Sequence, residues 1–189
     1  SWVICPFLVM ALAFALYHLL GVILRKIRGS SILFQHALGW MAIISGCYAA
    51  YSLGANHAGT AVGPIANLGM VHPTLLLFIG GASIAVGAIT YGKKVADTVG
   101  KAIVPLDVPS AFAAQVSAAL GMHLFSILGI PVSTSSAIVG AVVGVGLVRG
   151  VRAVRGKTIL IIVAGWVLTP CLAAFSSFLL YRFLMMALG

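Results

Sequence analysis

The sequence predicts an all-α protein that crosses a membrane several times, and three observations support this. Of its 189 residues, 62% are hydrophobic and only 7% are charged, whereas soluble domains carry about 25% charged residues. Apolar runs of the length that a membrane helix needs, about 20 residues, recur along the chain. The basic residues gather in short clusters between these runs. A soluble fold of this size could not bury so much apolar surface, so the lipid bilayer is an expected partner.

The apolar runs give the expected order of elements. Full spans are predicted at residues 2–24, 32–53, Leu75–Thr90 with its flanks, and 158–181. Between residues 110 and 148 the pattern differs, because two shorter apolar stretches flank the sequence GIPVSTSS at 129–136. Each stretch is marginal as a full crossing. The region therefore predicts either a helical hairpin with its tip at 129–136 or two full crossings.

The basic clusters predict which side of the membrane the loops occupy. They fall in residues 25–31, 92–109 and 149–157, each between apolar runs. Loops rich in Lys and Arg remain in the cytoplasm, so these three loops are expected there, in a multi-pass protein of the plasma membrane. The net charge of +9 does not indicate nucleic-acid binding, because the basic residues form no contiguous surface that could follow phosphates.

The stretch GANHAGTAVGP at residues 54–64 interrupts an otherwise apolar sequence. If residues 32–53 cross the membrane and 74–91 cross back, then 54–72 form a broken or re-entrant element. Irregular backbone at membrane depth is tolerated only where protein buries it or where it lines a cavity. Interruptions at 54–64 and 129–136 are together typical of a transporter binding site near the middle of the membrane.

A short repeat predicts how the chain is organised. Residues 2–6 read WVICP and residues 166–170 read WVLTP, each followed by a long apolar run. We therefore expect residues 1–30 to hold the last helix of a preceding repeat and its cytoplasmic loop, and residues 31–189 to form a C-terminal transport repeat. The partner repeat is expected on the same longer chain or on another copy, within a homodimer.

Several motifs resemble those of the inorganic phosphate transporter family, which also includes sulfate permeases. The family signature G-A-N-D-V-A-N-A-x-G-P is similar to residues 54–64, and G-x-P-V-S-T-T-H-A-I-V-G-A-x-x-G-V-G is similar to GIPVSTSSAIVGAVVGVG at 129–146. The stretch TYGKKVADTVGKAI at 90–103 resembles a third family motif, and GWVLTP resembles a fourth. The resemblance extends from residue 2 to about residue 180.

The resemblance implies an ion-coupled transporter of a tetrahedral oxyanion, built from inverted repeats that hold the anion between them. It implies that Asn56, Ser133, Thr134 and Ser135 line the site for substrate or coupling ion. Several positions depart from the family pattern: His57 replaces an Asp that serves as a sodium ligand, Gly59 and Thr60 replace Ala and Asn, and Ser136 replaces His. Imidazole is a poor ligand for an alkali cation, so the proton is expected as coupling ion rather than sodium.

The residues at these positions can also be assessed by their chemistry. The sequence PVSTSS predicts a helix N-terminus, where peptide N–H groups and the macrodipole attract anions. The predicted substrate-binding residues are Asn56, Thr60, Gln115, Ser133, Thr134, Ser135 and Ser136. The alternative is that the hydroxyl groups only cap a helix and that Gln115 only braces neighbouring helices.

His57 is the expected coupling residue, with Asn56 beside it. Imidazole changes its charge in the physiological pH range, and a titratable group at membrane depth indicates a function. We expect His57 to gain a proton when the anion binds, which would give proton–anion symport. The alternative is a neutral histidine bonded to the backbone. His123, in the first arm of the hairpin, is expected to make a structural hydrogen bond.

The sequence as a whole predicts a permease that imports an inorganic oxyanion, phosphate by resemblance, with no cofactor, no metal and no enzymatic activity. A sulfate permease is the alternative within the family. An anion channel and an intramembrane serine hydrolase are candidates from different classes. The hydrolase would pair one of residues 133–136 with a histidine base, but no G-x-S-x-G motif is present.

Overall fold

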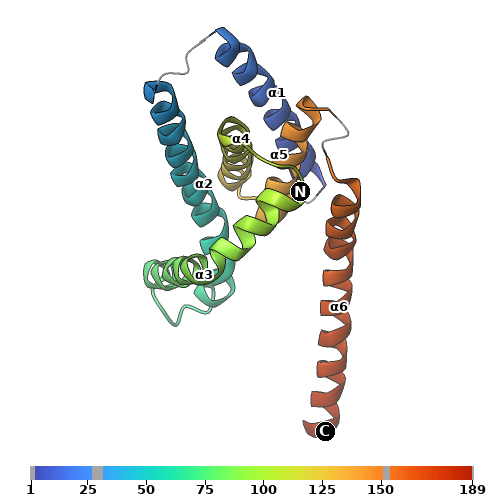
Figure 1. Cartoon of the computed structure of the whole chain (residues 1–189). Coiled ribbons are helices and arrows are strands. Elements are labelled where there is room, and N and C mark those ends of the chain that lie inside the picture. The colour runs from blue at the N-terminus through green and yellow to red at the C-terminus, as the bar shows by residue number, and fades with distance from the viewer. Residues whose placement is uncertain (1–2, 27–31, 151–153, 189) are drawn as a thin grey trace. The chain divides into compact units, whose positions relative to one another are not determined.

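The computed structural model describes residues 3–26, 32–150 and 154–188, and within them all regular structure is helical (Figure 1). The helices are α1 (Ile4–Lys26), α2 (Ile32–Ala66), α3 (Pro73–Ala102), α4 (Val108–Ile127), α5 (Thr134–Val148) and α6 (Gly156–Leu188). All but α5 contain an apolar segment long enough to cross a membrane. The all-α, multi-pass prediction is confirmed. The chain divides into two compact units, residues 1–154 and 155–189, and α6 belongs to the second.

The predicted break at residues 54–64 is wrong, because α2 continues without interruption from Ile32 to Ala66. The irregular backbone lies instead at residues 67–72. Glycine in a helix costs about 1 kcal/mol relative to alanine but does not end it. Pro64 removes only the bond to the carbonyl four residues earlier, and it lies within the last turn of α2. The polar stretch is therefore helical, and its residues spaced four apart share a face of α2.

The loop predicted at residues 92–109 is largely helical, since α3 extends to Ala102. Lys and Ala are good helix formers, so the basic stretch continues the apolar helix that precedes it. Only residues 103–107 connect α3 to α4. Residues 27–31 and 151–153 of the other two basic clusters lie outside the described residues.

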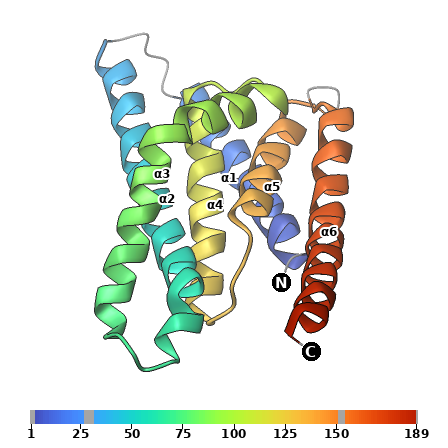
Figure 2. The same cartoon turned by 90° about the horizontal axis from the view of Figure 1, so that it is seen from below.

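The predicted helical hairpin is confirmed as α4 and α5, joined by residues 128–133 (Figure 2). Helix α4 begins with a capping box between Asp107 and Ser110 and ends at Ile127. Two residues later, Gly129 has φ +68°. The N–H of Gly129 donates to the carbonyl of Ser126 and that of Ile130 donates to the carbonyl of Phe125. This pair of bonds is a Schellman motif, which needs a residue with positive φ. The glycine thus sets the direction in which the chain leaves α4.

Helix α1 packs against both arms of the hairpin, and two glycines of α5 make this contact close. A Cβ atom added at Gly140 would collide with the backbone of Pro6, and one at Gly144 would collide with the carbonyl group of Met10. Small residues at such positions allow two helix backbones to approach each other in a membrane. Cys5, Val9 and Ala13 of α1 are fully buried there. The assignment of residues 1–30 to a preceding repeat stays a prediction.

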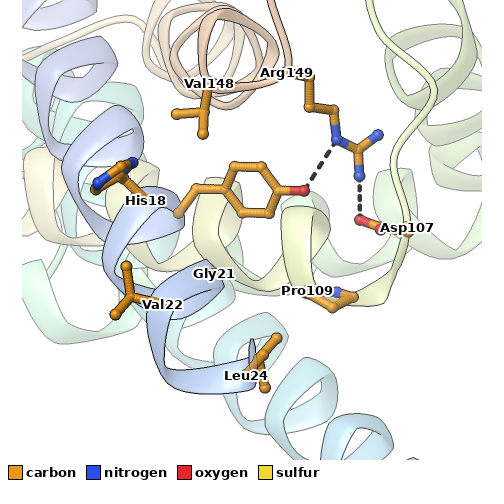
Figure 3. A pocket seen from close by; sticks show the side chains of 9 residues that line it. His18, Gly21, Val22, Leu24, Asp107, Pro109, Val148 and Arg149 are labelled. Carbon is orange, nitrogen blue, oxygen red and sulfur yellow. Dashed lines mark hydrogen bonds and ion pairs between the residues drawn. The ribbon is translucent and has the colours of Figure 1, made fainter. Parts of the chain in front are cut away.

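Arg149 joins the open ends of the two hairpin arms to α1 (Figure 3). Its guanidinium forms an ion pair with Asp107 at 2.5 Å. It also donates to the hydroxyl of Tyr17 at 3.0 Å and to the carbonyl of Pro105 at 2.6 Å. Tyr17, Asp107 and Arg149 border a cavity of about 460 Å³. Partial burial alone would raise the pKa of Asp107, but hydrogen bonds from Ser110 and the charge of Arg149 outweigh it, and the pKa is lowered.

The close contact at Gly140 predicts a large effect of a single methyl group. Gly140→Ala places that methyl against the backbone of Pro6, which has no rotamer to change. We expect a destabilisation of about 1–3 kcal/mol, as in other overpacked cores, measured by thermal unfolding in detergent. The matched control is Gly21→Ala in α1, where nothing lies within 4 Å of the added Cβ. Equal melting temperatures for the two variants would contradict this packing.

The clamp around Arg149 predicts a dependence of stability on pH. Because the pKa of Asp107 is lower in the folded protein than in the unfolded chain, its contribution is complete above the unfolded pKa and disappears as the pH falls through the folded value. We therefore expect the melting temperature to decrease on acidification below about pH 4. Asp107→Asn should reduce this decrease while lowering the melting temperature at pH 7. An unchanged acid profile in Asp107→Asn would argue against the clamp.

Candidate functional site

Asn56 of α2 connects this helix to the tip of the hairpin. Its Nδ2 donates to Oγ of Ser126 at 3.0 Å, and its Oδ1 accepts from the backbone N–H of Val132 at 3.3 Å. Asn56 and Val132 are both buried. A buried backbone donor without a partner costs about 1–3 kcal/mol, and Val132 lies in the tip, between the two helices. One side chain on α2 therefore satisfies and positions the tip.

The tip leads directly into the N-terminus of α5, which Ser133 caps. The Ser133 hydroxyl accepts from the N–H of Ser136 at 3.4 Å, and the Ser136 hydroxyl donates to the carbonyl of Ser133 at 2.8 Å. Ser136 is almost fully buried, whereas the side chain of Ser135 is exposed. The first N–H groups of a helix carry about half a positive charge, so the start of α5 offers donors to an anion.

His57 lies next to this helix start. Its imidazole Nε2 is 3.0 Å from the hydroxyl oxygen of Thr134, the first residue of α5. The direction of this bond depends on the tautomer of the ring. Asn56 and His57 are neighbours on α2, so the two side chains contact the hairpin tip at two adjacent points.

A cavity of about 350 Å³ opens beside Asn56. Small residues of α2 form one wall, and the end of α4 and the tip form the other. The lining residues are Ala55, Asn56, Gly59, Thr60, Gly63, Ser126, Gly129, Ile130 and Pro131. None of them is charged, so the cavity offers an amide and two hydroxyl groups rather than a full charge. Small-molecule sites commonly have volumes of about 300–1,000 Å³.

The structure brings most of the predicted site residues together. Asn56, His57, Thr60 and the start of α5 meet around the hairpin tip. Thr60 also donates to the carbonyl of Asn56 at 2.8 Å. Ser126 belongs to the same group and was missed by sequence reasoning. It is a polar residue in an apolar arm, which is the signal that drew attention to Gln115.

Gln115 lies elsewhere. Its side chain is 2.6 Å from the hydroxyl of Ser45, between α2 and α4. Eleven residues of α4 separate it from Ser126, which corresponds to roughly 16 Å along the helix. His123 makes the expected hydrogen bond, because its Nδ1 is 2.9 Å from the hydroxyl of Tyr48. These contacts brace α4 against α2 at a distance from the cavity, and a substrate-binding role for Gln115 stays a prediction.

Comparisons with known proteins identify relatives of this chain. Residues 33–177 match the profile of the Phosphate transporter family. A protein of Methanocaldococcus jannaschii that bears the name phosphate permease is 34% identical over 182 residues, which is 96% of this chain and 58% of that protein. The protein of Arabidopsis thaliana named inorganic phosphate transporter 2-1 is 35% identical over 144 residues, which is 69% of this chain and 24% of that protein.

A solved structure, described as the sodium-dependent phosphate transporter, superimposes with a TM-score of 0.62 at 30% identity. The match covers 87% of this chain and 52% of that one. The chain thus spans 58% of the Methanocaldococcus jannaschii protein and 52% of the solved transporter. Since the family profile covers most of the chain and includes both sides of the cavity, the chain belongs to the phosphate transporter family.

Proposed function

We propose that this chain supplies one half of the substrate site of a permease that carries inorganic phosphate across the membrane. The observation that carries the proposal is the contact of Asn56 and His57 with the tip that starts α5. Neutral polar groups line the cavity beside Asn56, and the positive end of the α5 dipole follows the hairpin tip that borders it. This combination suits a tetrahedral oxyanion. The other half of the site comes from a second repeat, on a longer chain or on another copy.

The proton is the proposed coupling ion. His57 lies beside the start of α5, with its Nε2 3.0 Å from the hydroxyl oxygen of Thr134, where a bound anion would come close to the imidazole. The negative charge of a bound phosphate would attract an imidazolium cation. Anion binding therefore favours proton binding, and the two ions cross together. A neutral His57 that only bonds to Thr134 is the alternative and predicts no such linkage.

Sodium is the second candidate for the coupling ion, because the superimposed transporter is described as sodium-dependent. Among the described residues, no group of three His, Cys, Asp or Glu side chains is placed to hold a metal ion. A sodium site in this half would therefore use hydroxyl, amide and backbone oxygens, ligands that alkali and alkaline-earth cations accept.

Sulfate transport, hydrolysis and channel activity make different demands on this site. Sulfate has the same shape as phosphate, so a cavity with neutral donors does not exclude it. A serine hydrolase needs a serine next to its base, but the hydroxyl nearest His57 belongs to Thr134. An anion channel would not accumulate phosphate above equilibrium. The permease is therefore the preferred function, in an orientation that places the basic clusters in the cytoplasm.

His57→Gln tests the coupling. In proteoliposomes of the full-length protein, an inward proton gradient imposed by changing only the internal pH should accelerate phosphate uptake by the wild type. We expect this acceleration to disappear in His57→Gln, because glutamine keeps a hydrogen bond to Thr134 but does not titrate. The matched control is His18→Gln on α1, which should keep the response.

The same vesicles distinguish the candidate coupling ions and substrates. Gradient-driven uptake by His57→Gln equal to that of the wild type would exclude the proton role of this residue. A strict requirement for sodium at both pH values would favour the second candidate. Competition by sulfate as strong as that by unlabelled phosphate would assign the wider substrate range.

Asn56→Ala tests the bridge to the hairpin tip. The variant leaves the buried N–H of Val132 without its acceptor, so we expect a loss of about 1–3 kcal/mol in stability and weaker phosphate binding. The measurements are thermal unfolding in detergent and equilibrium binding of labelled phosphate. Asn67→Ala, in the exposed turn after α2, is the matched control and should be nearly silent. If both alanine variants bound phosphate equally well, the tip would not depend on Asn56.

A further inference from the structure

The repeat between the two ends of the chain is longer than the WVxxP motif. When residue 2 is aligned with residue 166, identical residues continue along both helices. The matching pairs are Trp2 and Trp166, Val3 and Val167, Pro6 and Pro170, Leu8 and Leu172, Phe14 and Phe178, Leu16 and Leu180, Tyr17 and Tyr181, Leu20 and Leu184, and Leu24 and Leu188. The matches at residues 14–17 lie two to three turns beyond the motif, so α1 and α6 are two versions of one helix.

The structure shows how α1, the first of these two related helices, packs against the hairpin. One face of α1 lies on the α4–α5 hairpin, with the backbone of Pro6 at Gly140 and that of Met10 at Gly144. Val9 fills the space beside Gly121 of α4. At the far end, the hydroxyl of Tyr17 accepts from Nε of Arg149, which follows the last residue of α5. The contact therefore combines a glycine pair, a buried residue and an arginine that reaches a tyrosine.

The corresponding face of α6 has the composition of a packing surface. The positions equivalent to Val9, Met10 and Ala13 are the small residues Ala173, Ala174 and Ser177. Among the positions equivalent to exposed residues of α1, Phe175, Phe178 and Leu179 are large, whereas Cys171 and Ser176 are small. In membranes small residues mark the side that meets another helix, and lipid accepts the large ones.

We propose that the face formed by Pro170, Ala173, Ala174, Ser177 and Tyr181 docks on a second helical hairpin of the α4–α5 type. The partner arm carries two glycines four residues apart, which receive the backbone at Pro170 and Ala174. It ends in an arginine or lysine that donates to the hydroxyl of Tyr181. The hairpin of another copy of this chain is not the partner, because α1 already covers Gly140 and Gly144 there.

A helix exchange tests whether the α6 face fits such a hairpin. In the chimera, a copy of residues 166–186 replaces residues 2–22 of the full chain, while α6 itself is kept. Cross-linking reports the docking, because the Cβ of Val9 is 3.7 Å from a Cβ built on Gly121, close to the value of about 3.8 Å in native disulfides. The reference protein carries Val9→Cys and Gly121→Cys, with the native cysteines replaced by serine. The chimera carries cysteines at the same two positions.

The expected yield follows from this geometry. The chimera should form at least about half as much disulfide as the reference protein, since the Cβ separation suits the bond. The control is a chimera in which residues 164–184 replace residues 2–22, a shift of two residues that turns the helix by roughly 200°. This control should lose the cross-link. A folded chimera without the cross-link, or a shifted chimera that links equally well, would overturn the inference.

A second measurement does not depend on whether the chimera folds. In the full-length protein in membranes, Ala174→Cys should react with a lipid-soluble maleimide at least about tenfold more slowly than the native Cys171, because docking would bury position 174 and leave position 171 facing lipid. Equal rates would contradict docking. A disulfide-linked dimer through Ala174→Cys would assign the face to a second α6 instead, and would also overturn the proposal.

Discussion

The hydrogen bond from the N–H of Val132 to the side chain of Asn56 is the interaction on which the site depends. The chain between α4 and α5 leaves its helical hydrogen bonds in a protein whose surroundings are largely apolar. Backbone groups in such surroundings need partners within the protein. Asn56 supplies one to the tip and is itself held by Ser126. Next to this bond between Asn56 and the tip, Ser133 caps α5 and the hydroxyl of Thr134 contacts the imidazole of His57.

The glycines of the 54–64 stretch contribute space and not flexibility. Gly59 and Gly63, with Ala55, lie one helical turn apart and line the cavity. Larger side chains at these positions would fill it. The helix tolerates them because α2 is long and is braced against α4 by the Ser45–Gln115 and Tyr48–His123 contacts. The stability that glycine removes locally is offset by packing at a distance, so a regular helix can border a hollow.

Much of the fold could be predicted from the sequence, because apolar runs of membrane length and the clusters between them are direct consequences of the bilayer. The hairpin was found for the same reason, since Gly129 and Pro131 both oppose a helix. The continuity of α2 was not predicted, because glycine and proline signal a break equally in a loop and at the end of a helix. The bond from Asn56 to the tip could not be predicted either, because it joins residues more than seventy positions apart. Ser126 was overlooked for a related reason, because only the path of the tip brings it to Asn56.

The two ends of the hairpin are held by interactions of different kinds, and this difference bears on where the protein can respond to its substrate. At the open end Arg149 joins α1, α4 and α5 through an ion pair and several charge-assisted hydrogen bonds, which are roughly twice as strong as neutral ones. At the tip the side-chain hydrogen bonds to α2 come from amide, hydroxyl or imidazole groups, and each contributes only about 1 kcal/mol net. If the chain carries phosphate as proposed, an anion or proton arriving at the tip would compete with bonds of this strength. A change of conformation linked to the proposed transport is therefore expected where α2 meets the tip.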